Sequence, residues 1–106
     1  MSNLLDAGDL DIENYLHQHK ALLLDFWAPN CAPCRLLESN LVSIADTFSN
    51  RVQVLKVNVN ENPRTSARFQ VRSLPTLVFI KEGRVKTQLI GAVNQKKIEA
   101  VLQDIV

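Results

Sequence analysis

A run of apolar residues from Ala21 to Ala28 constrains the fold of this chain more than any other feature. Only Asp25 places a charge inside the run. A nearly continuous apolar segment of this length is typical of a strand buried on both faces, as in a sheet covered by helices. Cys31 and Cys34 follow, and the residues after them are apolar at helical spacing. The sequence therefore predicts a central strand joined to a helix at a Cys-x-x-Cys pair.

The other hydrophobic patterns predict an α/β fold with one mixed sheet. In chain order they indicate a short edge strand at Leu4 and Leu5, a helix from Asp9 to His19 capped by Asp9, the strand 21–28, a helix from Cys34 to Phe48, a strand 52–59, a short helix with Asn62 as cap and Pro63 at its first position, strands 76–80 and 84–90, and a helix from Asn94. The early crossovers require parallel strands, while Glu82-Gly83 predicts an antiparallel hairpin. Helices are therefore expected on both faces of the sheet.

Composition limits the class of protein. A chain of 106 residues fits a single domain over residues 1–106, and a net charge of +1 argues against a nucleic-acid partner. The longest apolar run is too short to cross a membrane, and we expect no signal peptide, because no charged region followed by an apolar one opens the chain. We therefore expect a cytoplasmic protein. In a reducing compartment, two cysteines suggest redox chemistry or metal binding rather than a disulfide scaffold.

The cysteine pair has the spacing and the position for dithiol–disulfide exchange. A helix N-terminus stabilises a thiolate, so the first cysteine, Cys31, is predicted to attack a substrate disulfide, and Cys34 to resolve the mixed disulfide. Pro33 fits the first helical turn because that turn needs no N–H from it. An inert buried pair is the plain alternative. A metal is not expected, because His17 and His19 are the only histidines and face different ways.

Asp25 is the second informative residue. It is either a structural carboxylate paired with Lys56 on a neighbouring strand, or a base of raised pKa that takes the proton of Cys34 through water. We favour the base, and both Asp25 and Lys56 are therefore candidate catalytic residues.

The chain resembles the thioredoxin family from Ala21 onward. The resemblance rests on an ordered set of motifs: Asp25-Phe26-Trp27-Ala28, Cys31-x-Pro33-Cys34, Lys56-Val57-Asn58-Val59, Asn62-Pro63, Leu74-Pro75-Thr76, Gly83 and Gly91-Ala92. It implies a four- or five-stranded sheet flanked by four helices and a protein-disulfide reductase with no cofactor beyond the Cys31–Cys34 disulfide.

The resemblance also implies the site and the partners. Pro75 would be cis beside the cysteines, and the backbone of Leu74 would pair with an extended substrate. Trp27 would flank the site, and Gly91 and Ala92 would belong to an apolar rim. The implied partners are disulfide-containing target proteins and a thioredoxin reductase or equivalent electron donor, with the chain itself expected to be a monomer.

Three residues depart from the family pattern. Asn30 replaces a usual tryptophan, Ala32 a usual glycine, and Ser39 a usual proline. The first change removes an apolar contact surface, the second is expected to shift the redox potential, and the third should leave a straighter helix. Asn30, Ala32 and Pro33 thus join the candidate substrate-binding residues.

Two other functions fit the same residues. An oxidase or isomerase of this fold would differ mainly in potential. A binding module or holdase subunit would act whatever the redox state of its cysteines.

Overall fold

A computed structural model describes residues 3–106 of the chain. Its elements are β1 (Leu4–Asp6), α1 (Ile12–Gln18), β2 (Ala21–Trp27), α2 (Ala32–Thr47), β3 (Gln53–Asn58), α3 (Pro63–Arg68), β4 (Thr76–Lys81), β5 (Arg84–Ile90) and α4 (Gln95–Ile105). This is the predicted order, and most boundaries differ from the prediction by a few residues at most.

The five strands form one mixed sheet in the order β1-β3-β2-β4-β5. β1 and β2 run parallel to β3, whereas β4 runs antiparallel to β2 and to β5. The β4–β5 hairpin turns at Glu82 and Gly83, both at positive φ, as a two-residue hairpin turn requires. β2 lies at the centre and is buried over six of its seven residues, which explains its apolar sequence.

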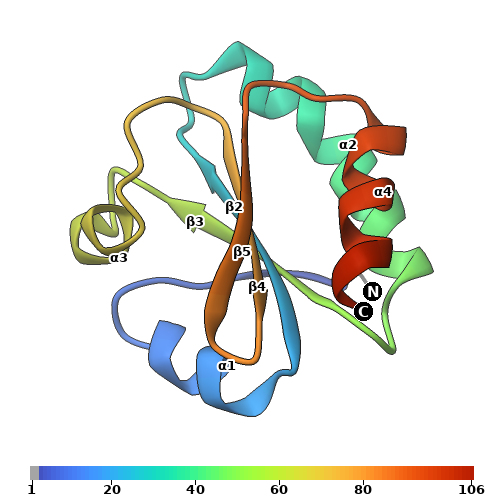
Figure 1. The fold of residues 1–106 in the computed structure, drawn as a ribbon. Helices are drawn as coiled ribbons and strands as arrows, with labels where there is room; N and C mark the ends of the chain where they lie inside the picture. Colours follow the sequence, from blue (N-terminus) through green and yellow to red (C-terminus); the bar gives the residue numbers. More distant parts are fainter. Residues whose placement is uncertain (1–2) are drawn as a thin grey trace.

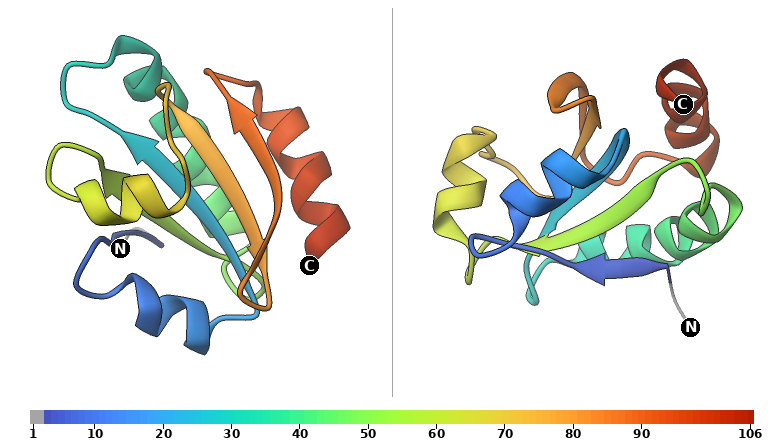
Figure 2. Two further views of the ribbon diagram at one scale, coloured as in Figure 1. Left: turned by 60° about the vertical axis from the view of Figure 1, so that its left-hand side comes forward. Right: turned by 90° about the horizontal axis from the view of Figure 1, so that it is seen from below.

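Helices cover both faces of the sheet (Figures 1 and 2). α2 and α4 lie side by side on one face, where Leu23 of β2 packs against Leu41 and Ile98. α1 and α3 cover the other face, where Phe26 packs against Phe69. Because neighbouring residues of a strand point to opposite faces, Asp25 lies on the same face as Leu23, under α2. Lys56 shares that face, two residues after Val54 of β3.

The predicted cap of α1 is wrong, whereas the predicted positions of Asn62 as N-cap and Pro63 as first residue of α3 are confirmed. α1 begins at Ile12 rather than near Asp9, and Asn62 makes no side-chain bond to the start of α3. Instead, Asp9 caps α3: its carboxylate accepts bonds from the backbone N–H of Thr65 at 2.7 Å and of Arg64 at 3.2 Å, and from the Thr65 hydroxyl at 2.6 Å.

Asn62 bonds back to the loop that precedes α1. The backbone N–H of Asp9 donates to Asn62 Oδ1 at 3.0 Å. Gly8 makes this approach possible, because a Cβ at that position would lie 1.8 Å from Asn62 Oδ1. The Asp9 carboxylate thus bonds to the start of α3, and the Asn62 amide bonds to the loop before α1. These reciprocal hydrogen bonds join α1 to α3.

Candidate active site

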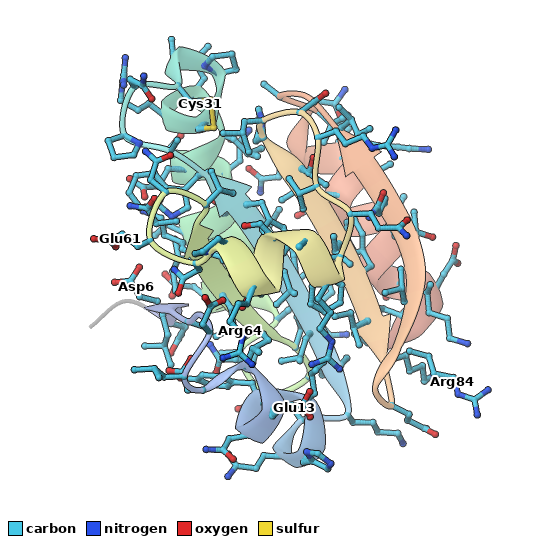
Figure 3. The ribbon with its side chains drawn as sticks, turned by 90° about the vertical axis from the view of Figure 1, so that its left-hand side faces the viewer. Asp6, Glu13, Cys31, Glu61, Arg64 and Arg84 are labelled. Atoms are coloured by element: carbon cyan, nitrogen blue, oxygen red, sulfur yellow. A yellow bond between two sulfur atoms is a disulfide. The ribbon has the colours of Figure 1, made fainter. Side chains whose placement is uncertain are left out.

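The cysteine pair lies at the N-terminal end of α2 (Figure 3). Cys31 is the N-cap residue, and its Sγ accepts a bond from the backbone N–H of Cys34 at 3.3 Å. The two cysteines are joined by a disulfide across a Cα–Cα distance of 5.3 Å, which is within the ordinary range. Cys31 is partly exposed, whereas Cys34 is 3% exposed. Only the first sulfur is therefore open to a large substrate.

The loop before α2 is held in place by the helix that it precedes. Arg35 Nη1 donates to the carbonyl of Pro29 at 2.7 Å, and the N–H of Cys31 donates to the carbonyl of Ala28 at 3.2 Å. Asn30, Ala32 and Pro33 remain unburied on this loop and in the first helical turn. Any partner that reaches Cys31 must therefore pass these side chains.

Asp25 lies buried beneath the cysteines. It is 1% exposed, and its Oδ1 has no hydrogen-bond partner among residues 3–106. Burial raises the pKa of Asp25 to about 7, because the charged form loses its solvation; the Lys56 cation lowers this pKa and the Glu38 carboxylate raises it. A carboxyl with such a pKa can exchange a proton near neutral pH.

Lys56 does not form the ion pair with Asp25 that the structural interpretation predicted. The two residues are register partners on β3 and β2, but Lys56 Nζ pairs with Glu38 Oε1 of α2. The same Nζ lies 4.3 Å from the centroid of the Trp27 ring, a cation–π geometry. Lys56 therefore acts on Asp25 through its charge and not through a direct bond in the described chain.

A cavity of about 330 Å³ connects these groups. Its lining consists of Asp25, Trp27, Pro29, Cys34, Arg35, Glu38 and Lys56. A water molecule takes up about 30 Å³ in the liquid, so the cavity has room for a chain of waters between Asp25 and Cys34. Four of the predicted site residues meet here: Asp25, Trp27, Cys34 and Lys56. Pro29, Arg35 and Glu38 are additions to the prediction.

The predicted substrate-facing residues lie at the same end of the sheet. Phe26 of β2 pairs with Thr76, and Thr76 pairs with Ile90, so Pro75 and Gly91 lie beside the end of β2. The Leu74–Pro75 peptide bond is cis, as the resemblance implied. The N–H of Gly91 donates to the carbonyl of Pro75 at 2.8 Å, which ties the two loops together.

These loops differ in exposure. Leu74 and Gly91 are half-buried, Ala92 is exposed, and Pro75 is buried. The neighbouring Ile90 is 63% exposed. Leu74, Ala92 and Ile90 thus offer apolar surface to a partner beside the cysteine pair.

The thioredoxin family model matches residues 7–104 of this chain. That match includes the strands β2 to β5, the helices α1 to α3, nearly all of α4 and the site described above. The chain belongs to the thioredoxin family. Membership, together with the cysteine pair, makes it a thiol–disulfide oxidoreductase.

Individual thioredoxins are similar to the chain over nearly its full length. Thioredoxin of Alicyclobacillus acidocaldarius is 39% identical over 97 residues, covering 92% of each chain. Thioredoxin of Haemophilus influenzae is 39% identical over 99 residues, again covering 92% of each. Among solved structures, oxidised mitochondrial thioredoxin 3 of Saccharomyces cerevisiae aligns with a TM-score of 0.87 at 27% identity, covering 95% of this chain and 94% of that one. The fold is thus the thioredoxin fold, with five strands and four helices.

Glu38 is the functional candidate that sequence reasoning missed. It follows Cys34 by four residues and therefore lies on the same face of α2, one turn further on. The spacing of four residues could have indicated that Glu38 lies near Cys34. Glu38 was overlooked because a charged residue in an amphipathic helix is expected on its solvent-facing side. Within the described residues, no three His, Cys, Asp or Glu side chains gather as a metal site would require.

Proposed function

We propose that this member of the thioredoxin family reduces disulfide bonds in target proteins, with Cys31 as the attacking thiol and Cys34 as the resolving thiol. The observation that carries the assignment is the unequal exposure of the two cysteines: Cys31 is partly exposed at the helix end, whereas Cys34 is 3% exposed. A protein substrate can reach the first sulfur and not the second.

The reaction has two exchange steps. The Cys31 thiolate attacks a substrate disulfide, forming a mixed disulfide and releasing one substrate thiolate, which takes a proton from solvent. The Cys34 thiolate then attacks Cys31 Sγ, forming the Cys31–Cys34 disulfide and releasing the second substrate sulfur as a thiolate, which takes up a proton. Two electrons pass to the substrate, and no cofactor beyond the cysteine pair is needed.

Asp25 would accept the proton that Cys34 must lose before the second step. Support comes from its raised pKa and from the cavity that it shares with Cys34. Lys56 would tune this base by its charge. Trp27 would form one wall of the cavity.

Substrate would bind across the loops beside Cys31. Leu74 offers backbone groups next to Pro75, and Ala92 and Gly91 provide a shallow rim, so an extended peptide segment could pair there by strand addition. Asn30 and Ala32, exposed beside Cys31, would adjust which partners fit.

The cellular setting is part of the same proposal. A thioredoxin reductase or equivalent donor would return the disulfide to the dithiol, so the monomeric protein would carry electrons and support cell redox homeostasis in the cytoplasm. None of the helices within residues 3–106 has the length and apolar character needed to span a bilayer.

Insulin reduction tests the activity directly. With dithiothreitol as electron source, catalytic amounts of the protein should bring forward the precipitation of insulin, measured as turbidity. A Cys31→Ser variant should match dithiothreitol alone. A wild-type rate equal to that background would contradict the proposal.

The roles of the two cysteines are tested by trapping. A Cys34→Ser variant should accumulate mixed disulfides with target proteins, seen as species on non-reducing gels that dithiothreitol releases, because the resolving thiol is gone. A Cys31→Ser variant is the matched control. Equal trapping by both variants would contradict the assignment of Cys31 as the attacking thiol.

A further inference from the structure

Lys56 lies within reach of two carboxylates and binds only one of them. Asp25 and Lys56 are register partners on adjacent parallel strands, which lie about 4.8 Å apart. The Lys56 ammonium nevertheless pairs with Glu38 and sits over the Trp27 ring. Asp25 Oδ1 is left without a hydrogen-bond partner in the described residues.

Glu38 holds this ammonium from the outer side of the cavity. Its side chain is 46% exposed and that of Lys56 is 19% exposed, whereas Asp25 lies at the floor of the same cavity and is 1% exposed. Since Glu38 lies on the Cys34 face of α2, it can pull the cation outward without leaving the active site. The two carboxylates therefore compete for one cation.

We propose that Glu38 is a positioning residue that holds Lys56 at the mouth of the cavity, keeps it from pairing with Asp25, and so sets the pH at which Asp25 accepts the proton of Cys34. The inference rests on the role of Asp25 proposed above. A cation paired with a carboxylate favours its charged form, so moving the cation away favours the protonated form. The charge of the Glu38 carboxylate also raises the pKa of Asp25 directly, so the test must separate this repulsion from the positioning of Lys56.

Two other charged groups lie near this pair. Asp6 of β1 is the register partner of Lys56, but none of the ion pairs within residues 3–106 joins the two. From α2, Arg35 also lines the cavity, but its Nη1 donates to the carbonyl of Pro29. Cys34, on the same helix, is the proposed proton donor. From β4, the register partner of Asp25 is the uncharged Leu77.

The test is a Glu38→Gln variant, with the Asp25 carboxyl carbon titrated by NMR in the reduced protein. The variant should release Lys56 to Asp25 and lower the titration midpoint of Asp25 by about one pH unit. The pH profile of mixed-disulfide resolution should move downward in parallel. Glu13→Gln is the matched control, because Glu13 also pairs with a cation, Arg68, and lies at the opposite end of the molecule from Cys31 (Figure 3).

Repeating the Glu38→Gln titration in a Lys56→Met background separates two effects of Glu38: its hold on Lys56 and the direct repulsion between its carboxylate and Asp25. If Glu38 acts by holding Lys56, then Glu38→Gln should shift the Asp25 midpoint much less when Lys56 is absent. An equal shift in both backgrounds would overturn the proposal, as would a Glu38→Gln midpoint no different from that of Glu13→Gln. The NMR titration does not depend on turnover, so loss of insulin reduction would count against the proposed function and not against this inference.

Discussion

Burial of Asp25 has two effects. It makes the charged form of the residue destabilise the fold, and it raises the pKa that lets the residue accept a proton in the active site. It is 1% exposed, its Oδ1 is unpartnered within residues 3–106, and burial raises its pKa to about 7. An unfolded aspartate has a pKa of about 3.9. Between these two values the folded protein binds more protons than the unfolded chain, so the free energy of unfolding falls as pH rises from about 4 to about 7.

An Asp25→Asn variant should therefore be more stable than wild type at pH 8, by about 2–4 kcal/mol, since it removes a buried charge. Near pH 4, where Asp25 is protonated in the folded state, the gain should nearly vanish. Urea unfolding at the two pH values measures this, with the exposed Asp104→Asn as control. A gain of equal size at both pH values would show that ionisation of Asp25 is not its cause.

The same Asp25→Asn variant should slow mixed-disulfide resolution more than substrate attack. Asparagine cannot accept the proton of Cys34, whereas Cys31 attacks as a thiolate at the helix end. Single-turnover reduction of a model disulfide, followed by Trp27 fluorescence, would separate the two steps. Unchanged resolution at pH 7 would remove Asp25 from the proton path.

At the scale of single elements, α3 depends on a distant residue. It has six residues, too few to be stable alone, and its first N–H groups are satisfied by Asp9 from the loop before α1. The hydrogen bond from the Thr65 hydroxyl is the main reason why the pKa of Asp9 is lowered. A carboxylate of lowered pKa stabilises the fold above its unfolded pKa and loses that effect as pH falls through the folded value.

An Asp9→Ala variant should lower the Tm by roughly 5 °C at pH 7, because the cap of α3 is lost. The α3 amides should also exchange hydrogen faster, ahead of any change in β2. Asp6→Ala, exposed in β1, is the control. An unchanged Tm would mean that water replaces the carboxylate at no cost.

The elements could be predicted because each carries its own pattern. The apolar spacing in α2 and α4 and the alternation in β3 are local signals, and Asn94 was placed at the start of α4, where its side chain accepts a bond from the Lys97 N–H. The side-chain cap that Asp9 supplies to α3 could not be predicted in this way. Asp9 and Thr65 are 56 residues apart, and only the folded sheet brings them together.

At the scale of the whole molecule, stability should decrease from the centre of the sheet to its edge. β2 is buried and paired on both sides, whereas β5 is an edge strand whose residues are mostly exposed. β2 amides should therefore exchange hydrogen only by global unfolding, and β5 amides by local opening. Exchange measured against urea would show this, and β5 amides as slow as those of β2 would contradict it.

The active site was predictable to the extent that its residues lie in one segment. Cys31, Cys34 and Asp25 fall within ten residues of each other, and their strand–helix junction fixes their relation. The direct Asp25–Lys56 pair was a reasonable inference from alternation, but it failed because β3 also faces α2, where Glu38 competes. The sequence indicates which residues share a strand face and does not show which helix side chain will reach them.

The hydrogen bonds between Asp9 and α3 also have a consequence for how the protein folds during synthesis. A ribosome adds about 5–20 residues per second, so Thr65 is joined to the chain roughly 3 to 11 seconds after Asp9. During that interval the N-terminal segment has left the ribosome first but cannot yet make the contacts that hold α1 to α3. In the same way, β1 cannot pair until β3, its neighbour in the sheet, has been synthesised. The earliest part of the nascent protein thus makes its native contacts only after more than half of the chain has been synthesised.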